Sequence, residues 1–486
     1  MNLSSYSKNS ITKEDSPSIH QVVSGGYCVG CGACAAVSDG SLKMSLQRNG
    51  TYVPVKNFHD ESTKFNDEKL ASACPFSSRS ISEDKLAATF LPDAIYRNSE
   101  IGNYIESNVM HVASEALRAS SSSGGVARWL LAELLDQGHV THVAHVVSTA
   151  PADLGGALFE FSLTSDSNAL VNSAKSAYYP VSLEEIIPAI KDINGTVAIT
   201  AIPCFAKSIR QICLQDPELR SKVKVIVGII CGHMKSRAFG ELLAWQVGVK
   251  PSQLGGVDFR LKLPNLPANH KGFSAYNAET GNWTHPVDTK GLVGGDWGLG
   301  LMKNHACEFC DDVLAEVADV SIGDAWLPEY TSNPKGHSIV VIRSPLIKQV
   351  VHAGLKRGDL EQTSVDANTV ARSQAGGLRH RREGLSFRLS VAQKKRLWHP
   401  PKRVSANTIG IPRSRQKIYS LRYLLAVESL KAFSKAKSAD SLQLFYDEMA
   451  ETMAKYKKIA SPSWRRILSP VKRVIPAAIL KRLRGK

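Results

Sequence analysis

Apolar runs of strand length alternate with helix-like segments through the middle of the chain, and this alternation restricts the fold more than any other feature of the sequence. The helix-like segments are residues 126–138, 183–195, 205–216 and 236–248, and the apolar runs are residues 139–148, 196–204, 222–232 and 337–344. Strands that alternate with helices of this length form parallel sheets with helices on both faces. The sequence therefore predicts an α/β fold with a parallel or mixed sheet flanked by helices.

The length and composition describe a globular protein of more than one domain. The chain has 486 residues, of which 43% are hydrophobic and 21% charged, and these values exclude a wholly disordered chain, a collagen or a coiled-coil rod. The first twenty residues contain no apolar core of a secretory signal, and the longest apolar run, residues 225–231, is too short to span a membrane. We expect a cytoplasmic protein whose nine cysteines stay reduced and available to bind metal.

Three evenly spaced cysteines near the N-terminus are the strongest chemical signal in the chain. Cys28, Cys31 and Cys34 form a C-x2-C-x2-C motif, and Cys74 stands in a later Cys-Pro pair. Three thiolates at this spacing, completed by a Cys-Pro, are typical of a 4Fe–4S cluster, and the glycines between them let the loop fold around it. Zinc is the alternative, but structural zinc sites usually use two separated pairs of ligands.

Five cysteines remain, and four of them suit a second metal site. Cys307 and Cys310 form a C-x2-C pair, while Cys204 and Cys231 each follow a predicted buried strand, at the sheet edge where α/β proteins bind ligands. Cys213 falls inside a predicted helix, where a packed thiol is expected. The spacing allows a second 4Fe–4S cluster and equally allows a zinc knuckle or buried free thiols.

A Ser/Gly-rich loop precedes the helix predicted at residues 126–138. Ser122, Ser123, Gly124 and Gly125 place hydroxyls and backbone N–H groups at the positive end of that helix, where a phosphate or a flavin edge can bind. The same residues also suit a simple N-cap, so the loop alone does not decide between the two functions.

Several motifs, in order along the chain, together resemble one protein family. They are YCVGCGAC with its later Cys-Pro, the SSGG loop, AIPCFAKSIRQI, GIICGHMKS, DFRLK and CEFCDDVLAEVADVSIGDAW. Over roughly residues 20–345 the chain is similar to the coenzyme F-420 hydrogenase/dehydrogenase beta-subunit family, which includes ferredoxin-dependent tetrapyrrole reductases such as 7-hydroxymethyl chlorophyll a reductase. The resemblance implies an N-terminal 4Fe–4S ferredoxin-like module (residues 1–95) and an α/β domain (residues 96–375) that binds FAD. It also implies two 4Fe–4S clusters, the second held by Cys204, Cys231, Cys307 and Cys310.

The resemblance further implies individual site residues. The expected flavin-binding positions are Ser122, Ser123, Gly124, Gly125, Ser176, Tyr178, Pro203, Asp258 and Arg260. Arg128 stands where the family usually has Thr or Ser, and an arginine there can pair with a phosphate. The candidate catalytic residues are His233, which can donate a hydrogen bond to a cluster or supply a proton, together with Lys262 and Asp324. Each of these residues can equally be structural, since charged residues on strands are usually solvated and an Asp can simply turn the chain.

This combination of cofactors implies an oxidoreductase. A flavin exchanges two electrons or a hydride, whereas Fe–S clusters move electrons singly, so a protein that holds both couples the two modes. The expected electron partner is ferredoxin or a deazaflavin coenzyme. The sequence also allows a homo-oligomer. The alternative is a non-catalytic metal-binding assembly protein attached to the membrane surface.

The positive charge of the chain is concentrated in its last quarter. Residues 371–486 contain 28 Lys and Arg against 6 Asp and Glu, whereas residues 1–370 contain 32 against 38. We expect residues 376–486 to form a basic helical extension whose last segment, residues 463–486, lies on the anionic inner face of a membrane. Such a location would suit a redox step in polysaccharide biosynthesis. A basic helix that docks on the acidic body is the alternative, and no nucleic-acid partner is expected because no recognition motif is present.

Overall fold

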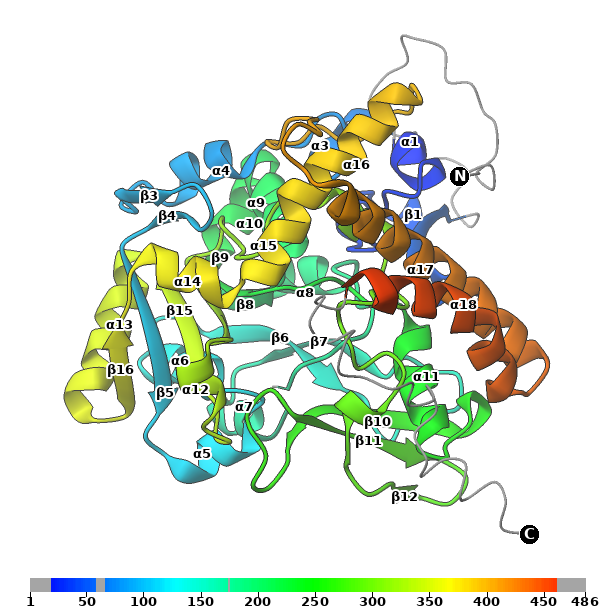
Figure 1. The fold of residues 1–486 in the computed structure, drawn as a ribbon. Helices are drawn as coiled ribbons and strands as arrows, with labels where there is room; N and C mark the ends of the chain where they lie inside the picture. The colour runs from blue at the N-terminus through cyan, green and yellow to red at the C-terminus, as the bar shows by residue number, and fades with distance from the viewer. Residues whose placement is uncertain (1–18, 58–65, 174, 461–486) are drawn as a thin grey trace.

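A mixed eight-stranded sheet organises the computed structural model, which describes residues 19–57, 66–173 and 175–460 (Figure 1). In sheet order its strands are β16 (Leu360–Ser364), β5 (Glu106–Val112), β15 (Ser338–Ile342), β14 (Val320–Asp324), β9 (Val223–Ile229), β8 (Val197–Ala201), β6 (His142–Ser148) and β7 (Phe159–Thr164). Strands β14, β9, β8 and β6 run parallel, and the outer strands pair antiparallel. The predicted α/β fold with a mixed sheet is therefore confirmed.

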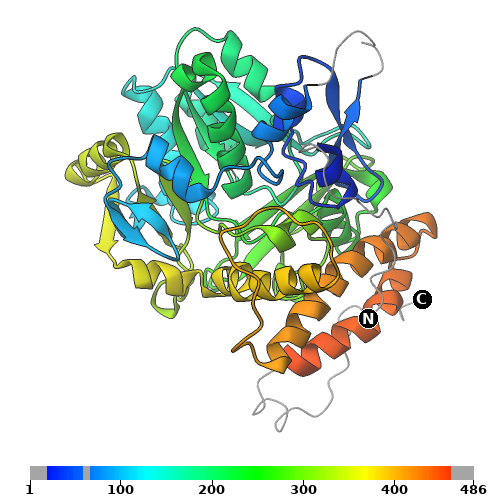
Figure 2. The same ribbon diagram turned by 90° about the horizontal axis from the view of Figure 1, so that it is seen from above.

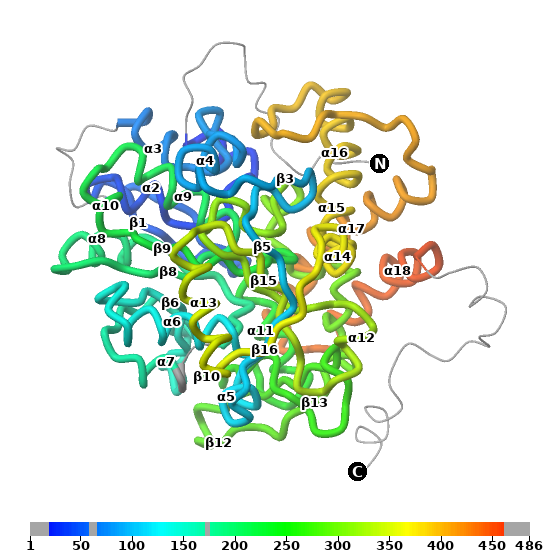
Figure 3. Tube along the Cα trace, turned by 90° about the vertical axis from the view of Figure 1, so that its left-hand side faces the viewer, coloured from blue at the N-terminus to red at the C-terminus, as the bar shows by residue number. Residues whose placement is uncertain are grey.

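Helices cover both faces of this sheet, because its central strands are apolar on both sides. Helices α6 (Val126–Asp136) and α13 (Pro345–Arg357) pack together on one face, as Figure 3 shows. Helix α9 (Pro203–Gln215), flanked by α8 (Ile186–Asp192) and α10 (Pro217–Lys222), covers part of the other face. The helices and strands predicted between residues 126 and 232 are all present in the large sheet and the helices that cover it.

The N-terminal part packs on the sheet through α9. Its helices α2 and α3 and the later helix α4 all contact α9, and β1 and β2 form an antiparallel pair. Its elements are α1 (Ile19–Ser24), α2 (Ala33–Ala36), β1 (Leu42–Leu46), β2 (Tyr52–Lys56), α3 (Asp67–Ala73), α4 (Glu83–Phe90), β3 (Tyr96–Asn98) and β4 (Gly102–Tyr104). Of two further helices, α5 (Glu115–Ser120) precedes α6 in the chain, and α7 (Ser167–Ser173) contacts α6 in space.

A smaller antiparallel sheet forms a second core with helices from the C-terminal quarter. Strand β10 (Leu254–Lys262) pairs with β11 (Lys271–Asn277), which also pairs with β12 (Asn282–Trp283) and β13 (Val287–Asp288). Helix α11 (Arg237–Gln246) lies between this sheet and α17 (Arg413–Ser438), which packs lengthwise on α18 (Leu442–Ala460), as Figure 2 shows along one edge of the molecule. Short elements η1 (Pro251–Gln253), η2 (Thr289–Gly291), η3 (His305–Phe309) and α12 (Pro328–Thr331) complete this region.

The described part of the C-terminal quarter is helical, as predicted. Helices α14 (Ala367–Ser373), α15 (Ala375–Arg381) and α16 (Glu383–Lys394) follow one another almost without interruption before α17. The segment expected at a membrane surface, residues 463–486, lies outside the described residues. Among the described helices none combines the length and the apolar character needed to cross a bilayer. The domain boundaries near residues 95 and 375 stay predictions.

Candidate functional site

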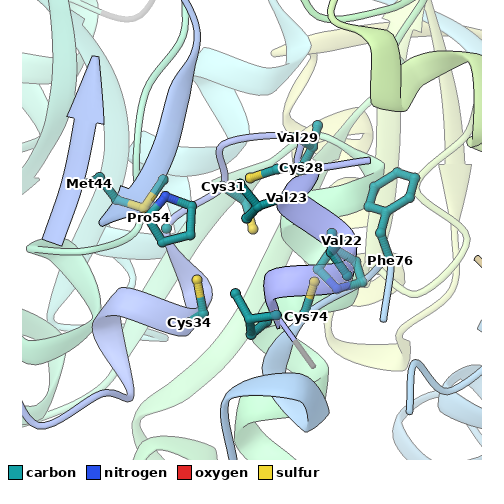
Figure 4. A pocket seen from close by; sticks show the side chains of 13 residues that line it. Val22, Val23, Cys28, Val29, Cys31, Cys34, Met44, Pro54, Cys74 and Phe76 are labelled. Atoms are coloured by element: carbon teal, nitrogen blue, oxygen red, sulfur yellow. The ribbon is translucent and has the colours of Figure 1, made fainter. Parts of the chain in front are cut away.

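Four cysteines line one small pocket in the N-terminal part of the molecule, and we call them the first tetrad. Cys28 and Cys31 precede α2, Cys34 lies within α2, and Cys74 follows α3. Figure 4 shows their sulfur atoms gathered around one space. The remaining wall is apolar and includes Val22, Val29, Met44, Pro54 and Phe76.

Two glycines allow the cysteine loop to fold this tightly. Gly30 and Gly32 both have φ of +77°, which side-chain-bearing residues rarely adopt. A Cβ on Gly30 would lie 2.9 Å from the carbonyl oxygen of Tyr52, and one on Gly32 would lie 2.0 Å from Ser182 Oγ. The motif therefore needs glycine at both positions for its conformation and for close packing.

The second tetrad consists of Cys204, Cys231, Cys307 and Cys310. Cys204 is the second residue of α9, Cys231 follows β9, and the other two stand in and directly after η3. Burial raises the pKa of Cys204 most strongly, and the other three thiols of the tetrad raise it further, which is consistent with a shared buried region. The structure thus brings together the four cysteines that the sequence predicts as one ligand set.

The two tetrads are neighbours. Cys31 Sγ lies 3.5 Å from Ser208 Oγ, and the Ser208 hydroxyl donates a hydrogen bond of 2.9 Å to the carbonyl oxygen of Cys204. Helix α9 carries both Cys204 and Ser208. One helix therefore connects the two cysteine sites.

Burial raises the pKa of all eight tetrad thiols, to about 12 for Cys28 and Cys307. Buried thiolates form only when a positive charge compensates them, so this donor set fits metal or cluster ligation. Two groups of four thiols match the ligands of two 4Fe–4S clusters. Within the described ranges, no three His, Cys, Asp or Glu side chains are arranged around a single metal ion.

A buried arginine faces the second tetrad. Arg381, on α15, is 2% exposed, and its Nη2 lies 3.9 Å from Cys231 Sγ and 2.9 Å from the carbonyl oxygen of Gly232. Burial acts to lower the pKa of Arg381, but the thiols of the second tetrad raise it above its usual range. Sequence reasoning missed this residue because it lies in a segment without a motif.

The Ser/Gly loop lies against the edges of two sheet strands. The Gly124 N–H donates to Ser338 Oγ (3.2 Å), and the Ser123 hydroxyl donates to the carbonyl oxygen of His337 (2.9 Å). A Cβ on Gly124 would lie 2.7 Å from the carbonyl oxygen of Met110. The loop is thus fixed between β5 and β15 at the start of α6.

Four cationic side chains surround this loop, and we call them the loop cations: Arg118, Arg260, Lys262 and Lys271. The carbonyl oxygen of Ser122 accepts from Arg260 (3.2 Å) and Lys271 (3.0 Å), and that of Ser123 accepts from Lys262 (2.8 Å). Asp324 is the carboxylate that pairs with Arg260, and it lies 3.8 Å from Lys271 Nζ. Four cations around one carboxylate leave a net positive site that suits a phosphate or pyrophosphate.

Two observations indicate that this positive site is built for an anion. Lys262 and Lys271 are direct cross-strand partners in the β10–β11 hairpin. This pairing is unfavourable when both lysines are charged, because like charges repel. Burial lowers the pKa of Lys262 to about 8 and that of Lys271 to about 7. An anion bound between them would relieve both effects.

Arg260 adopts φ of +62° at an irregularity of β10 between Phe259 and Leu261. A bulge of this kind turns a side chain out of the strand and is common near functional sites. Here the guanidinium reaches the Ser122 carbonyl and Asp324. The predicted site residues Arg260, Lys262 and Asp324 therefore meet at the predicted loop.

Aromatic side chains fill the space between the loop cations and the second tetrad. Burial raises the pKa of Tyr178, and Arg260 and the Cys231 thiol are among the groups that also influence it. The Tyr178 ring is 4.8 Å from that of Trp297, which in turn is 4.4 Å from the His233 ring. His233 is buried, and its Nε2 has no hydrogen-bond partner within the described part of the chain. Burial lowers the pKa of His233 well below its usual value, so the neutral imidazole is the stable form.

The other predicted residues have structural partners. The Ser122 hydroxyl accepts from the Ser176 backbone N–H (3.3 Å), and Arg128 donates to Ser120 Oγ (2.9 Å). Asp258 pairs with Lys175. Pro203 starts α9, and Cys213 is buried in the same helix, as predicted for a packed thiol.

Sequence reasoning also missed Arg118, Lys271 and Trp297. Lys271 had a usable signal, since a hairpin after DFRLK places a lysine opposite Lys262. Arg118 donates to the carbonyl oxygen of Gly336 (2.7 Å), a contact between segments far apart in sequence. Nothing local in the chain indicates such a contact.

Comparisons with known proteins identify the family. Residues 109–188 match the family model for the N-terminal part of the coenzyme F420 hydrogenase/dehydrogenase beta subunit, and residues 194–368 match the model for its C-terminal part. A chain of the xenon-derivatised F420-reducing nickel–iron hydrogenase complex from Methanosarcina barkeri is similar at a TM-score of 0.46 and 14% identity, over 62% of this chain and 96% of that chain. No curated protein matches the chain. The two family models together cover more than half of the sequence; the chain belongs to the coenzyme F420 hydrogenase/dehydrogenase beta-subunit family and is an oxidoreductase.

Proposed function

We propose that the protein is an iron–sulfur flavoprotein in which two 4Fe–4S clusters exchange single electrons with a flavin. The observation that carries the proposal is the adjacency of the two cysteine tetrads to each other and of the second tetrad to the loop cations. When bound, a flavin accepts or donates a hydride and the clusters carry one electron each.

The chain's own residues would hold these groups in order. Cys28, Cys31, Cys34 and Cys74 would ligate the first cluster, and Cys204, Cys231, Cys307 and Cys310 the second. The loop cations and the backbone N–H groups near Gly124 would bind the phosphates of FAD. Tyr178 and Trp297 would line the space between the flavin and the second cluster, and they would keep water out of it because both pack in an aromatic group with Phe239 and Phe259.

The electron donor would meet the first tetrad. The four cysteines lie in the N-terminal part, and their pocket wall includes residues of the β1–β2 hairpin. A ferredoxin or a deazaflavin coenzyme is the proposed partner. The further expectation of a role in polysaccharide biosynthesis rests only on the basic C-terminal segment, whose last part is outside the described residues, and it stays a prediction.

Anaerobic purification tests this proposal. We expect a brown protein with about eight irons and eight acid-labile sulfides per chain, together with stoichiometric FAD released on denaturation. Reduced ferredoxin, reduced deazaflavin and reduced nicotinamide are then added separately, and the one that bleaches the flavin identifies the donor class. A colourless protein with zinc in place of iron would refute the proposal.

A further inference from the structure

Arg381 differs from Arg388 and Arg403 of the C-terminal quarter in lacking a carboxylate partner. The buried Arg388 pairs with Glu308 (3.1 Å), and the half-buried Arg403 pairs with Glu316 (2.7 Å). Among the described residues no carboxylate forms an ion pair with Arg381, and its Nε has no hydrogen-bond partner. A charge that is buried without a partner is costly, so such a residue calls for an explanation.

The guanidinium of Arg381 is held by backbone and directed at the second tetrad. It donates to the carbonyl oxygens of Asp312 and Gly232, the latter at 2.9 Å. Its Nη2 lies 3.9 Å from Cys231 Sγ, and the thiols of Cys310 and Cys307 also act on its charge. The backbone bonds fix the position of the cation. The tetrad thiols act on its charge more strongly than the nearby Asp312 carboxyl does, so the tetrad is its main negative partner.

A 4Fe–4S cluster on four thiolates is an anion, and it becomes more negative when it gains an electron. A fixed, buried cation stabilises the more negative state by the larger amount, because the dielectric screening around it is weak. Arg381 lies on α15, beyond residue 368 where the family match ends.

We propose that Arg381 is the built-in counter-charge of the second tetrad, and that through it the C-terminal helices set the reduction potential of the cluster held there. This inference rests on the proposed function. The step concerned is the transfer of one electron to the cluster: no bond forms or breaks, the electron comes from the cluster of the first tetrad, and Arg381 keeps its protons throughout. It is a positioning residue that acts through the cluster.

The test is a redox titration of the full chain, prepared anaerobically and followed by electron paramagnetic resonance. The variants are Arg381→Gln, which removes the charge, and Arg381→Lys, which keeps it. The matched control is Arg382→Gln, because Arg382 is the adjacent arginine but lies 3.4 Å from the Glu316 carboxylate. The cluster of the first tetrad is an internal reference in every sample.

We expect Arg381→Gln to lower the equilibrium constant for reduction of the second cluster at least tenfold, a shift of about 59 mV to more negative potential for one electron. Arg381→Lys should stay within about threefold of the wild type, and Arg382→Gln and the first cluster should not change. If Arg381→Gln loses the iron of the second tetrad while Arg381→Lys keeps it, the counter-charge role is also supported.

Three results would overturn the inference: an unchanged potential in Arg381→Gln, equal shifts of both clusters, or the same shift or the same loss of iron in Arg381→Gln and Arg381→Lys. These results differ from failure of the proposed function. A protein that contains zinc and no cluster refutes both, whereas a normal iron content with an unchanged potential refutes only the role of Arg381.

Discussion

Burial determines the chemistry of the individual cysteines. The pKa of Cys28 and of Cys307 is raised by burial to about 12, and that of Cys213 to about 11. Free thiols with such values stay protonated at neutral pH, so the tetrad cysteines become thiolates only when metal binds and displaces the protons. Cys213 is buried in the same way, but the charges that act on its pKa come from Arg210, Asp216 and Arg220 and not from other cysteines.

Removal of one ligand from each tetrad should remove one cluster. Cys31→Ser and Cys310→Ser should each lower the iron content by about half and weaken the charge-transfer absorbance accordingly. Cys213→Ser is the control, and it should retain all of the iron. Colorimetric iron and sulfide analysis with the visible spectrum measures the effect. Full iron content in Cys31→Ser or Cys310→Ser would show that the assigned ligand is wrong.

The pKa of Lys271 predicts a pH-dependent affinity for anions. The pKa of Lys271 in the folded protein, about 7, lies below the usual value of about 10.4, because burial and then the neighbouring charge of Arg260 disfavour the protonated amine. Above pH 7 an anion must therefore bind together with a proton, and its affinity should fall by up to about tenfold per pH unit. The same shift makes the free protein more stable as the pH rises from 7 toward 10.4, since the unfolded chain then keeps a proton that the folded chain has lost.

Calorimetric titration of the flavin-free protein with inorganic pyrophosphate between pH 6 and pH 9 measures this dependence. In Lys271→Arg the side chain keeps its charge at every pH in this range. Subtracting the affinity profile of this variant from that of the wild type therefore cancels the contribution from protonation of pyrophosphate itself. The nearby groups that also titrate or carry charge are Lys262, Arg260, Arg118 and Asp324. Identical profiles for the wild type and Lys271→Arg would contradict the prediction.

At the scale of elements, local patterns were sufficient to predict the layered part of the fold. The strands and helices between residues 126 and 248 follow from apolar periodicity, and Cys204 and Cys231 follow from their places at the ends of β8 and β9. The loop cations could not be predicted in full. Arg118, Arg260 and Lys271 come from three elements that meet only in the folded chain, and the reach of Arg260 depends on a bulge with φ of +62°.

The loop before α6 depends on the absence of a side chain at Gly124. A Cβ there would lie 2.7 Å from the carbonyl oxygen of Met110 and 2.9 Å from Ser338 Oγ, so it would push the loop away from β5 and β15. We expect Gly124→Ala to lower the free energy of unfolding by about 1–3 kcal/mol and to weaken binding of FAD. Gly376→Ala is the control, because a Cβ at Gly376 meets no atom within 4 Å.

Thermal unfolding and fluorescence titration with FAD measure the two effects of Gly124→Ala. If the variant binds FAD as tightly as the wild type, the loop does not position the flavin. If both glycine variants lose stability equally, the close approach of the loop to the sheet is not the cause.

At the scale of the whole molecule, part of the positive charge of the last quarter is paired with carboxylates inside the fold. The acidic segment after the second C-x2-C pair is buried against the basic quarter: Asp311 lies 3.6 Å from Lys402, and Glu316 lies 2.7 Å from Arg403. The sequence allowed two explanations for the basic quarter, binding to a membrane surface and docking on the acidic body. Docking on the acidic body describes Lys402 and Arg403. The membrane explanation concerns residues 463–486, which are outside the described ranges. Charge counts along the chain could not distinguish the two, since they carry no information on which side chains are buried.

These contacts predict that the chain cannot be cut before α15 without loss of the second site. Leu385 and Leu389 belong to the same core as Cys307 and Cys310, and Arg388 and His380 hold the buried Glu308. A fragment of residues 1–374 would remove Arg382 and Arg403 from the buried Glu316 and Arg388 from the buried Glu308, at a cost of about 3–5 kcal/mol for each broken pair. We therefore expect this fragment to lose cooperative thermal unfolding and the iron of the second tetrad.

Co-expression of residues 375–486 as a separate chain should restore both properties, because the contacts are side-chain pairs and core packing that do not need a covalent connection. The full chain carrying Lys435→Ala is the control. Lys435 pairs with Glu448 at the surface, where an ion pair contributes no more than about 1 kcal/mol. If residues 1–374 alone unfold at the wild-type temperature with full iron content, the C-terminal quarter is an appendage and the charges of body and extension are independent. If only the co-expressed pair unfolds at the wild-type temperature with full iron content, the basic quarter is a structural part of the redox body. Its positive charge is then the counterpart of the acidic segment that carries Cys307 and Cys310.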